Sequence, residues 1–418
     1  MWSQPPSSRR RRFGALALVT FAALACATED RATAPAAERS DAAPLSAATP
    51  FSPATLASGR EIFRFDTYGD ETYWTDTLRM HEVIASSVTP LAALGLGLKV
   101  DLDALPASVV QGILSGAIKL DDPATTVALL ELNAVLGLKG EVHTAENGQK
   151  TLARVGITCA LCHSTVDDAF TAGIGRRLDG WPNRDLDVGK IVALSPAVPS
   201  ALKTILNGWG PGMYDPRLNV DGINAPVVIP PAFGLRHVAK ETYTGDGPVS
   251  YWNAYVAITQ MHGHGFFSDP RIGVSVSNPP DLVSAKLDAL RAYQLSLDAP
   301  EAPPVDRTAA QRGKQLFMSS AGCARCHTGD VRTDVNQGVL HSAAEVGQDP
   351  TYALRTATKL YRTTPLRGLW NPPQLDGPYF HDGSATTLEQ VVDHYVTQFG
   401  LSLTAQQKLD LVAFLKTL

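Results

Sequence analysis

The stretch Cys159-Ala-Leu-Cys162-His163 decides the fold, and the chain repeats its spacing at Cys323-Ala-Arg-Cys326-His327. On a helical turn, residues at positions i, i+3 and i+4 share one face, so each motif presents two sulfurs and one imidazole together. This pattern is typical of c-type haem attachment, in which both thiols bind the porphyrin and the histidine ligates the iron. The sequence therefore predicts two covalently bound haems, with His163 and His327 as proximal iron ligands.

Two other kinds of site also use paired cysteines. A closed structural zinc site holds four ligands, and pooling both cysteine pairs would leave both histidines without a role. A thioredoxin-like dithiol has no need of the histidine. The haem-attaching residues are therefore predicted to be Cys159, Cys162, Cys323 and Cys326.

The first 26 residues have the composition of a secretory signal peptide. A basic segment, 9–12, precedes an apolar run, 13–25, that is too short to span a bilayer. Cys26 ends a stretch resembling a lipobox, so both a lipid-anchored N-terminus and simple cleavage remain open. Residues 27–53 are rich in Ala, Pro, Ser and Thr and predict a disordered tether. We expect a periplasmic protein, either free or held to a membrane by an N-terminal lipid.

Length and charge restrict the domain count and the class of partner. The chain has 418 residues and a formal net charge of −5, which becomes more negative once the four arginines of the signal are removed. The length leaves room for about two or three domains. The acidic balance argues against nucleic acid as a partner and is compatible with a basic electron-transfer protein.

Further sequence elements recur in the same order around both motifs. The pairs are Gly59-Arg-Glu-Ile-Phe63 with Gly313-Lys-Gln-Leu-Phe317, Pro231-Ala-Phe-Gly-Leu235 with Pro365-Leu-Arg-Gly-Leu369, Tyr243-Thr-Gly-Asp-Gly247 with Tyr379-Phe-His-Asp-Gly383, and Leu290–Leu297 with Leu411–Leu418. Repetition in register indicates two copies of one structural unit. We predict a mostly α protein with two cytochrome c class-I-like haem domains, 54–298 and 307–418, joined by a Pro-rich linker at 299–306. The first and last helices of each domain are expected to cross.

The first domain carries an insert at about 65–156, ahead of its haem motif. Asp122-Pro123 predicts the start of one of its helices, because proline is favourable at a first helical position. The insert is predicted to be helical and either to fill out a small core or to cover the first haem. Under the second reading, His81 and Glu82 are the candidate acid/base residues.

The last helix is the most completely specified element. Thr404 and Gln407 form a capping-box pattern at its start. Leu411, Leu415 and Leu418 fall on one helical face, which predicts burial of that face.

The segments Tyr361–Gly368 and Gly377–Val392 resemble the bacterial di-haem cytochrome c peroxidase superfamily, which includes the peroxidase-like oxidase that matures methylamine dehydrogenase. The resemblance is specific over 307–418 and covers only the haem motif and repeat elements of 54–298. It implies one haem for electron transfer and one that reacts with hydrogen peroxide or oxygen. It also implies that a residue eight positions after Thr387, Tyr395, caps the second haem.

The positions of the methionines favour a sixth ligand other than methionine for the second haem. The methionines are Met1, Met80, Met213, Met261 and Met318. None follows His327, so the ordinary downstream methionine of a small cytochrome c is missing. The choices are Tyr395, His394, His381 or an open position.

For the first haem, Met261, His262 and His264 cluster beyond the Tyr-x-x-Asp-Gly element, and Met261 is the preferred sixth ligand. Arginines between 164 and 230 are expected to pair with haem propionates, although spacing does not say which ones.

The favoured function is therefore a di-haem oxidoreductase of peroxidase type that exchanges electrons with peroxide, oxygen or a small redox protein. A non-catalytic electron-transfer cytochrome with both irons six-coordinate is the alternative. An oxygenase that cleaves an organic substrate is the third reading.

Overall fold

A computed structural model describes residues 51–370 and 378–418. Its α-helices are α1 (Pro53–Phe65), α2 (Met80–Ser87), α3 (Pro90–Gly95), α4 (Ala107–Leu114), α5 (Pro123–Glu131), α6 (Ala160–His163), α7 (Val188–Ala193), α8 (Ser200–Leu206), α9 (Leu218–Asp221), α10 (Val249–Tyr255), α11 (Leu287–Ser296), α12 (Arg307–Met318), α13 (Ala343–Val346), α14 (Thr351–Leu354), α15 (Leu388–Gln398) and α16 (Ala405–Leu415). Two π-helical segments are η1 (Thr72–Thr77) and η3 (Val256–Gln260). Short 3₁₀ turns are η2 (Leu102–Ala104), η4 (Pro270–Ile272), η5 (Ser284–Lys286), η6 (Cys323–Arg325) and η7 (Asp334–Gln337).

The strands of the described residues pair into five two-stranded sheets. They are β1 (Val100–Asp101) with β5 (Ile174–Gly175), β2 (Leu138–Thr144) with β3 (Lys150–Ile157), β4 (Ser164–Val166) with β6 (Arg177–Asp179), β7 (Met213–Tyr214) with β8 (Val227–Val228), and β9 (Gly265–Asp269) with β10 (Val274–Asn278). The fold is therefore a mixture of helix and short strand pairs, which corrects the expectation of a mostly α protein.

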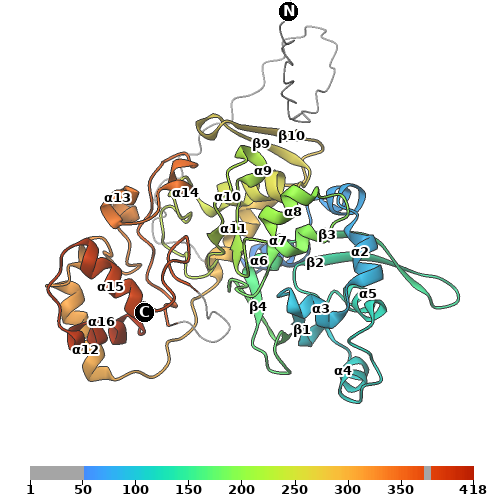
Figure 1. Ribbon diagram of the computed structural model, residues 1–418, viewed down its shortest axis with the longest axis horizontal. Coiled ribbons are helices and arrows are strands. Elements are labelled where there is room, and N and C mark those ends of the chain that lie inside the picture. Colours follow the sequence, from blue (N-terminus) through green and yellow to red (C-terminus); the bar gives the residue numbers. More distant parts are fainter. Residues whose placement is uncertain (1–50, 371–377) are drawn as a thin grey trace, which may run out of the picture. The chain divides into compact units, whose positions relative to one another are not determined.

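Two helix pairs carry the repeated sequence elements. Helix α1 packs against α11, and α12 packs against α16 (Figure 1). A Cβ atom built on Gly59 would lie 2.0 Å from the carbonyl oxygen of Ala289, and one on Gly313 would lie 1.9 Å from that of Asp410. Only glycine lets the helix backbones approach this closely. The predicted crossing of the helices in each pair is confirmed.

Each helix pair has its own apolar core. Phe63 and Tyr293 meet edge to face at 5.5 Å in the α1–α11 cluster. Phe317 and Phe414 do the same at 5.2 Å in the α12–α16 cluster. The matching aromatic pairs fill the matching crossings, because each phenylalanine follows its crossing glycine by four residues, about one helical turn.

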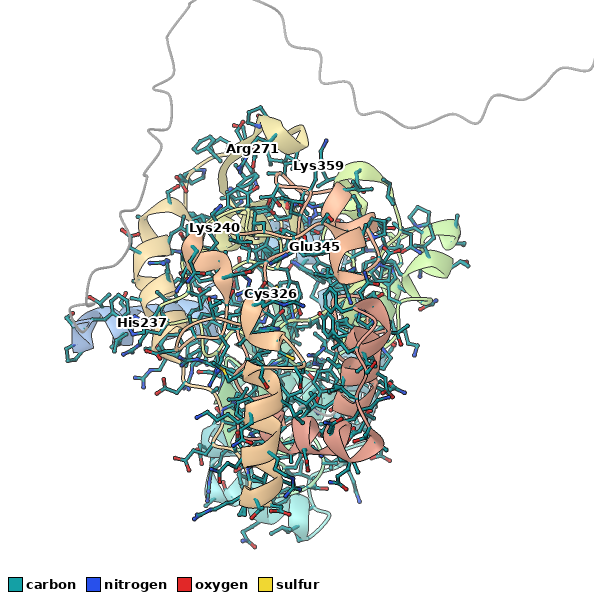
Figure 2. The ribbon with its side chains drawn as sticks, turned by 90° about the vertical axis from the view of Figure 1, so that its left-hand side faces the viewer. His237, Lys240, Arg271, Cys326, Glu345 and Lys359 are labelled. Atoms are coloured by element: carbon teal, nitrogen blue, oxygen red, sulfur yellow. The ribbon has the colours of Figure 1, made fainter. Side chains whose placement is uncertain are left out.

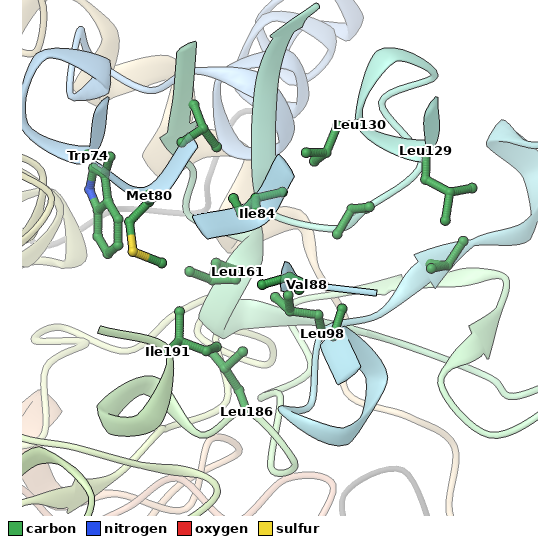
Figure 3. Packing of buried hydrophobic residues seen from close by; sticks show 14 of the residues in the cluster. Trp74, Met80, Ile84, Val88, Leu98, Leu129, Leu130, Leu161, Leu186 and Ile191 are labelled. Carbon is green, nitrogen blue, oxygen red and sulfur yellow. The ribbon is translucent and has the colours of Figure 1, made fainter. Parts of the chain in front are cut away.

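The insert shares a third core with residues between 161 and 229. Its buried side chains include Trp74, Met80 and Ile84, which face Leu130 and Leu161 across the cluster (Figure 3). The predicted start of α5 is confirmed, because the Asp122 side chain accepts a hydrogen bond from the Ala124 amide.

One part of the insert is not helical. Strands β2 and β3 form an antiparallel hairpin around Asn147-Gly148. The loop is closed by hydrogen bonds from the Ala145 amide to the Gln149 carbonyl and from the Gly148 amide to the Ala145 carbonyl. The expectation of a wholly helical insert was therefore wrong.

The C-terminal helix begins as predicted. The Thr404 hydroxyl accepts from the Gln407 amide, and the Gln407 side chain accepts from the Thr404 amide. Leu411 and Leu415 are buried, and Leu418 packs against the same cluster. The capping box and the buried face are confirmed.

The division into two domains and the assignment of the N-terminal segments stay predictions. Contacts place Leu45–Leu418 in one unit, and nothing separates 54–298 from 307–418 along the chain except a segment without regular structure between α11 and α12. The signal peptide at 1–26, Cys26 and most of the tether at 27–53 lie outside the described residues. Among the helices of 51–370 and 378–418, none is both long and apolar enough to cross a membrane.

Candidate haem site

Both cysteine motifs open into one cavity of about 1140 Å³. Its wall includes Cys159, Cys162 and His163 from the first motif and Cys323, Cys326 and His327 from the second. All four of these cysteines are free thiols, so their sulfurs are available for covalent attachment. Residues more than 160 positions apart are thus gathered at one site.

The first motif holds its histidine in a fixed tautomer. The His163 amide donates to the Cys159 carbonyl at 3.2 Å, which keeps the motif in a helical turn. Nδ1 of His163 lies 3.1 Å from the Pro230 carbonyl oxygen, which can only accept, so Nδ1 carries the proton. Burial lowers the pKa of His163 to about 4, and the ring stays neutral. Its Nε2 therefore keeps the lone pair that a metal requires.

The second motif repeats this arrangement. The His327 amide donates to the Cys323 carbonyl at 3.0 Å, although the residues between them form the 3₁₀ turn η6 instead of an α-helix. Nδ1 of His327 donates to the Arg332 carbonyl at 3.0 Å, and burial lowers the pKa of this ring. At metal sites, a ligating imidazole usually donates its other ring N–H to an acceptor such as a main-chain carbonyl, which fixes the orientation of the ring.

These residues fit a covalently bound c-type haem. Each motif offers two thiols and one neutral imidazole with Nε2 unprotonated, and all six side chains line the same largely apolar cavity. Once the thiols become thioethers they can no longer ionise. The high pKa of Cys159 and Cys162, about 12 for each because of burial, is therefore no obstacle to a neutral site.

Ionisable groups surround the second motif. Cys326 and Glu345, both labelled in Figure 2, line the cavity together with His341. Nδ1 of His341 lies 2.9 Å from Glu345 Oε1, and Nε2 lies 2.9 Å from Asp334 Oδ2. Ligand atoms of Cys326, Asp334 and His341 lie within 4.8 Å of one another, which is compatible with a metal ion. Attachment of haem to Cys326 would remove that sulfur from such a set.

Tyr395 is placed where a sixth ligand of the second haem could act. It lies on α15, lines the cavity, and its hydroxyl makes no hydrogen bond to another described residue. Phe399 stacks on its ring at 5.8 Å, and Phe380 packs against it edge to face. Burial first, and then the neighbouring Cys326 and Cys323, raise the pKa of Tyr395 to about 12.

The alternatives to Tyr395 have ring nitrogens already engaged. Nε2 of His394 donates to the Val346 carbonyl at 2.9 Å, and this histidine does not line the cavity. His381 does line the cavity, but its Nε2 lies 3.0 Å from the Tyr361 hydroxyl. That hydroxyl gives its proton to the Asp349 carbonyl, so Nε2 of His381 is the donor. Tyr395 remains the predicted ligand.

The three candidates at the first haem differ in their surroundings. His264 is occupied at both nitrogens, by the Pro279 carbonyl at 2.9 Å and the Thr72 hydroxyl at 3.2 Å. Met261 lines the cavity but also belongs to the α1–α11 core, so its sulfur stays a predicted ligand without further support. His262 lines the cavity and makes no hydrogen bond to another described residue.

The setting of His262 is unusual. It follows the π-helical segment η3, and its backbone lies in the left-handed region at φ 64°. Its ring stacks on Tyr73, from the second π-helical segment η1, with centroids 3.7 Å apart. The Trp74 indole, next along η1, donates to the Met261 carbonyl at 3.2 Å. π-Helical turns recur at functional sites, and here two of them meet at the cavity wall.

The predicted acid/base residues are not at the cavity. Glu82 pairs with Arg79 at 2.5 Å, and its side chain is 48% exposed. His81 also lies outside the cavity wall. The physical reason is the orientation of α2, which buries Met80 and Ile84 in the insert core and turns the following residues away. Glu82 and His81 therefore do not line the cavity, whereas η1 supplies Tyr73 and Trp74 from the same insert.

The carboxylates of the cavity wall are all paired. Among the described residues they are Asp215, Glu241 and Glu345, which bind Arg355, Arg291 and His341 respectively. Two guanidiniums on the wall lack such partners and have buried nitrogens. Nε and Nη1 of both Arg184 and Arg362 are buried without a hydrogen-bond partner among the described residues.

Comparison with known proteins agrees with this site. Residues 310–418 match the cytochrome c family and form a cytochrome c domain. The chain is 33% identical over 159 residues to the methylamine utilization protein MauG of Methylorubrum extorquens, covering 31% of this chain and 42% of that protein. It is 31% identical over 150 residues to the cytochrome-c peroxidase IdrP1 of Denitromonas iodatirespirans, covering 26% and 40%.

The chain thus spans about two fifths of the length of these relatives. The match to a cytochrome c domain and to these proteins indicates covalently bound c-type haem. Among solved structures, hydrazine synthase of Kuenenia stuttgartiensis aligns at 20% identity and a TM-score of 0.36, over 51% of this chain and 78% of that one. A MauG-like protein associated with microbial copper homeostasis aligns at 24% identity and a TM-score of 0.25, over 32% and 55%.

Proposed function

We propose that this protein is a di-haem c-type oxidoreductase of peroxidase type, with one haem on Cys159 and Cys162 and the other on Cys323 and Cys326. The observation that carries the proposal is the single cavity lined by both motifs, each with an oriented, neutral histidine. Bound haem iron would supply the redox chemistry with peroxide or oxygen. The similarity to MauG and to a cytochrome-c peroxidase supports the same class of reaction.

The two haems have different distal walls, which assigns them different tasks. Helices α10 and α15 occupy equivalent places in the repeat, with N-caps Pro248 and Thr387. Eight residues after the cap, the second unit has Tyr395 and the first has Val256, and both side chains line the cavity. Valine offers no donor to a metal. The second haem is therefore the electron-transfer haem, closed by Tyr395, and the first has the open position.

His262 is the group that moves protons at the open position. It is an imidazole on the cavity wall without a protein hydrogen bond, whereas the wall's other histidines are proximal ligands or are bonded to Tyr361 or to carboxylates. It can accept a proton at a ring nitrogen from a bound peroxide and return it to the departing oxygen. The stacked Tyr73 ring holds the imidazole in place.

Steady-state turnover of the fully haem-loaded protein tests this function. With a reduced small electron-donor protein and hydrogen peroxide, we expect catalytic donor oxidation. His262→Gln should lower kcat by about 10²- to 10⁴-fold, the range lost with a general acid/base. The matched control is His264→Gln, which changes a bonded histidine off the cavity wall and should leave turnover unchanged. Absence of peroxide turnover in protein that carries two haems would contradict the proposal.

A second candidate function rests on Met261. Because Met261 also lines the cavity, its sulfur could close the first iron and make the protein a pure electron carrier. The spin state of the ferric haems separates the two functions. A high-spin haem that changes on adding peroxide supports the enzyme, and two low-spin haems unaffected by peroxide support the carrier.

The cellular location and the electron partner of the protein are part of the same proposal. The signal-like N-terminus supports export to the periplasm, and the lipobox-like Cys26 supports a lipid anchor. An acidic net charge favours a basic redox protein as the electron partner. Fractionation of cells expressing the full chain, before and after Cys26→Ser, tests both points. Release of the variant from the membrane is the expected result.

A further inference from the structure

Two arginines of the cavity wall carry unbalanced charge. Arg362 is 7% exposed, and its Nε and Nη1 are buried without a hydrogen-bond partner among the residues that the structure describes. The same two atoms of Arg184 are also buried and unpartnered. Burial lowers the pKa of Arg362 to about 10 and lowers that of Arg184 as well. A buried cation without a counter-charge is strongly unfavourable, so an anion is missing from each of these places.

Two other buried arginines of the protein have the carboxylate partners that Arg184 and Arg362 lack. Arg355, whose side chain is 4% exposed, binds Asp215 and Asp221 and also donates to two main-chain carbonyls. Arg291 binds Glu241 on the cavity wall itself. These two guanidiniums are thus paired with carboxylates of the chain, whereas the buried Arg217 lies over the Trp252 and Tyr255 rings.

Each unpaired arginine is anchored beside a different haem motif. Arg184 follows Asn183, whose amide donates to the carbonyl of Cys162 at 2.9 Å. Arg362 precedes Thr363, whose carbonyl accepts from the Thr333 hydroxyl at 2.7 Å, and Thr333 follows the Arg332 carbonyl that orients His327. Each arginine is thus connected through the main chain to one of the two motifs.

The two arginines converge on one aromatic ring. The Arg362 amide donates to the Tyr243 carbonyl at 2.8 Å. Burial raises the pKa of Tyr243, and the charges of Arg184 and Arg362 both oppose that rise, so both guanidiniums lie close to the phenol. All three residues line the cavity. Two cations, one from each half of the chain, therefore face the same part of the cavity.

We propose that Arg184 and Arg362 bind the propionate carboxylates of the haems attached to Cys162 and Cys326, respectively. The inference rests on the proposed di-haem function, because it needs a haem in each motif. A guanidinium makes strong charge-assisted hydrogen bonds to carboxylate oxygens, and the unpartnered Nε and Nη1 of each arginine are free to donate them. The thioether bonds then hold one edge of each macrocycle, and an arginine holds the carboxylate edge.

Charge at the carboxylate edge also affects the redox potential. A guanidinium beside a propionate offsets its negative charge, which would otherwise favour ferric iron. Replacing Arg362 by glutamine should therefore lower the midpoint potential of the second haem, and Arg184→Gln should lower that of the first.

The experiment uses the full chain with both haems, checked by intact mass. Midpoint potentials and the propionate-bending bands in resonance Raman spectra are measured for Arg184→Gln, Arg362→Gln and Arg362→Lys. Each glutamine variant should shift the propionate band and lower the potential of one haem. Arg362→Lys should shift the band while keeping more of the potential, because lysine keeps the charge but not the paired hydrogen bonds. If Arg362→Gln fails to mature, the Arg362→Lys spectrum decides.

The control is Arg271→Gln, which removes an exposed arginine that pairs with Asp269 away from the cavity wall and should move neither readout. Unchanged propionate bands and potentials in protein with two haems would overturn this inference and leave the proposed function standing. Potentials that follow the concentration of added phosphate would also overturn it, since a free anion would then fill the sites. Fewer than two haems in the mature wild type would overturn both.

Discussion

The two haem motifs hold their histidines in the same way and differ on the opposite wall. His163 and His327 each donate from Nδ1 to a main-chain carbonyl, at 3.1 and 3.0 Å. Helix α15 then continues as a regular α-helix through Tyr395, whereas α10 changes to the π-helical η3 at Val256. In the proposed function, covalent attachment and proximal ligation would impose one geometry on both copies. The distal wall has no such constraint. In the proposed function, the difference between α15 and the α10–η3 segment would give the two haems separate chemistry.

The largest expected effect tests whether the two motifs are equivalent at attachment. Replacing Cys159 and Cys162 together by alanine should remove one haem from the mature protein, and so should the same change at Cys323 and Cys326. Each thioether pair is the covalent link to one macrocycle. Intact mass measures the loss, and Cys26→Ser, which changes a cysteine outside both motifs, should keep both haems. A zinc adduct, or a mass without haem in matured wild type, would refute the equivalence.

The next effect tests the difference at the distal wall. Tyr395→Phe keeps the ring and its stacking on Phe399 but deletes the oxygen. A phenolate is a hard anionic donor that favours ferric iron, so its loss should raise the midpoint potential of the second haem and make its ferric form high-spin. Optical and EPR spectra with a redox titration measure both changes. His394→Gln is the control, and an unaltered second haem in Tyr395→Phe would exclude tyrosine ligation.

The helix crossings should be equally sensitive in both halves. Gly59→Ala and Gly313→Ala each place a Cβ about 2 Å from a carbonyl oxygen, so the helices must separate. Overpacking of this kind costs about 1–3 kcal/mol of unfolding free energy. Denaturant unfolding of the haem-loaded protein measures it. Gly95→Ala, in a helix with nothing within 4 Å of the new atom, is the control and should not destabilise. A neutral Gly313→Ala would contradict the close crossing.

The helix pairs and the proximal side of the site could be predicted because each is specified locally. The crossing glycine, the phenylalanine one turn later and the cysteine spacing all lie within a few residues of one another. The hairpin in the insert carried such a signal too. Asn147-Gly148 between alternating residues is a strong hairpin pattern, and it was missed because the surrounding insert reads as helix.

The distal wall could not be predicted, because it depends on where distant segments meet. Glu82 and His81 have suitable chemistry, but Arg79 in the left-handed region at φ 57° starts α2 so that Met80 and Ile84 enter the insert core. The position of His262 depends on two π-helical turns that meet across about 190 residues of chain, and no local pattern specifies them.

The smallest expected effect concerns how the last helix of each unit begins. Helix α16 starts with the Thr404–Gln407 capping box, whereas the N-cap of α11, Lys286, makes no side-chain cap. In the first unit the turn η5 precedes the helix, and the Asp281 carboxylate accepts from the Val283 and Ser284 amides instead. The free amides at the start of this helical region are therefore capped before η5 instead of at the start of α11.

Thr404→Ala should therefore weaken α16 alone. Losing the hydroxyl leaves the Gln407 amide without its 3.2 Å acceptor, which costs about 1 kcal/mol. Hydrogen exchange should become faster in the first turn of α16 while that of α11 stays unchanged, since α11 has a separate capping residue. Thr404→Ser keeps the hydroxyl and should behave as the wild type. Equal acceleration in both helices would mean that the two units unfold together, and the caps would then no longer distinguish them.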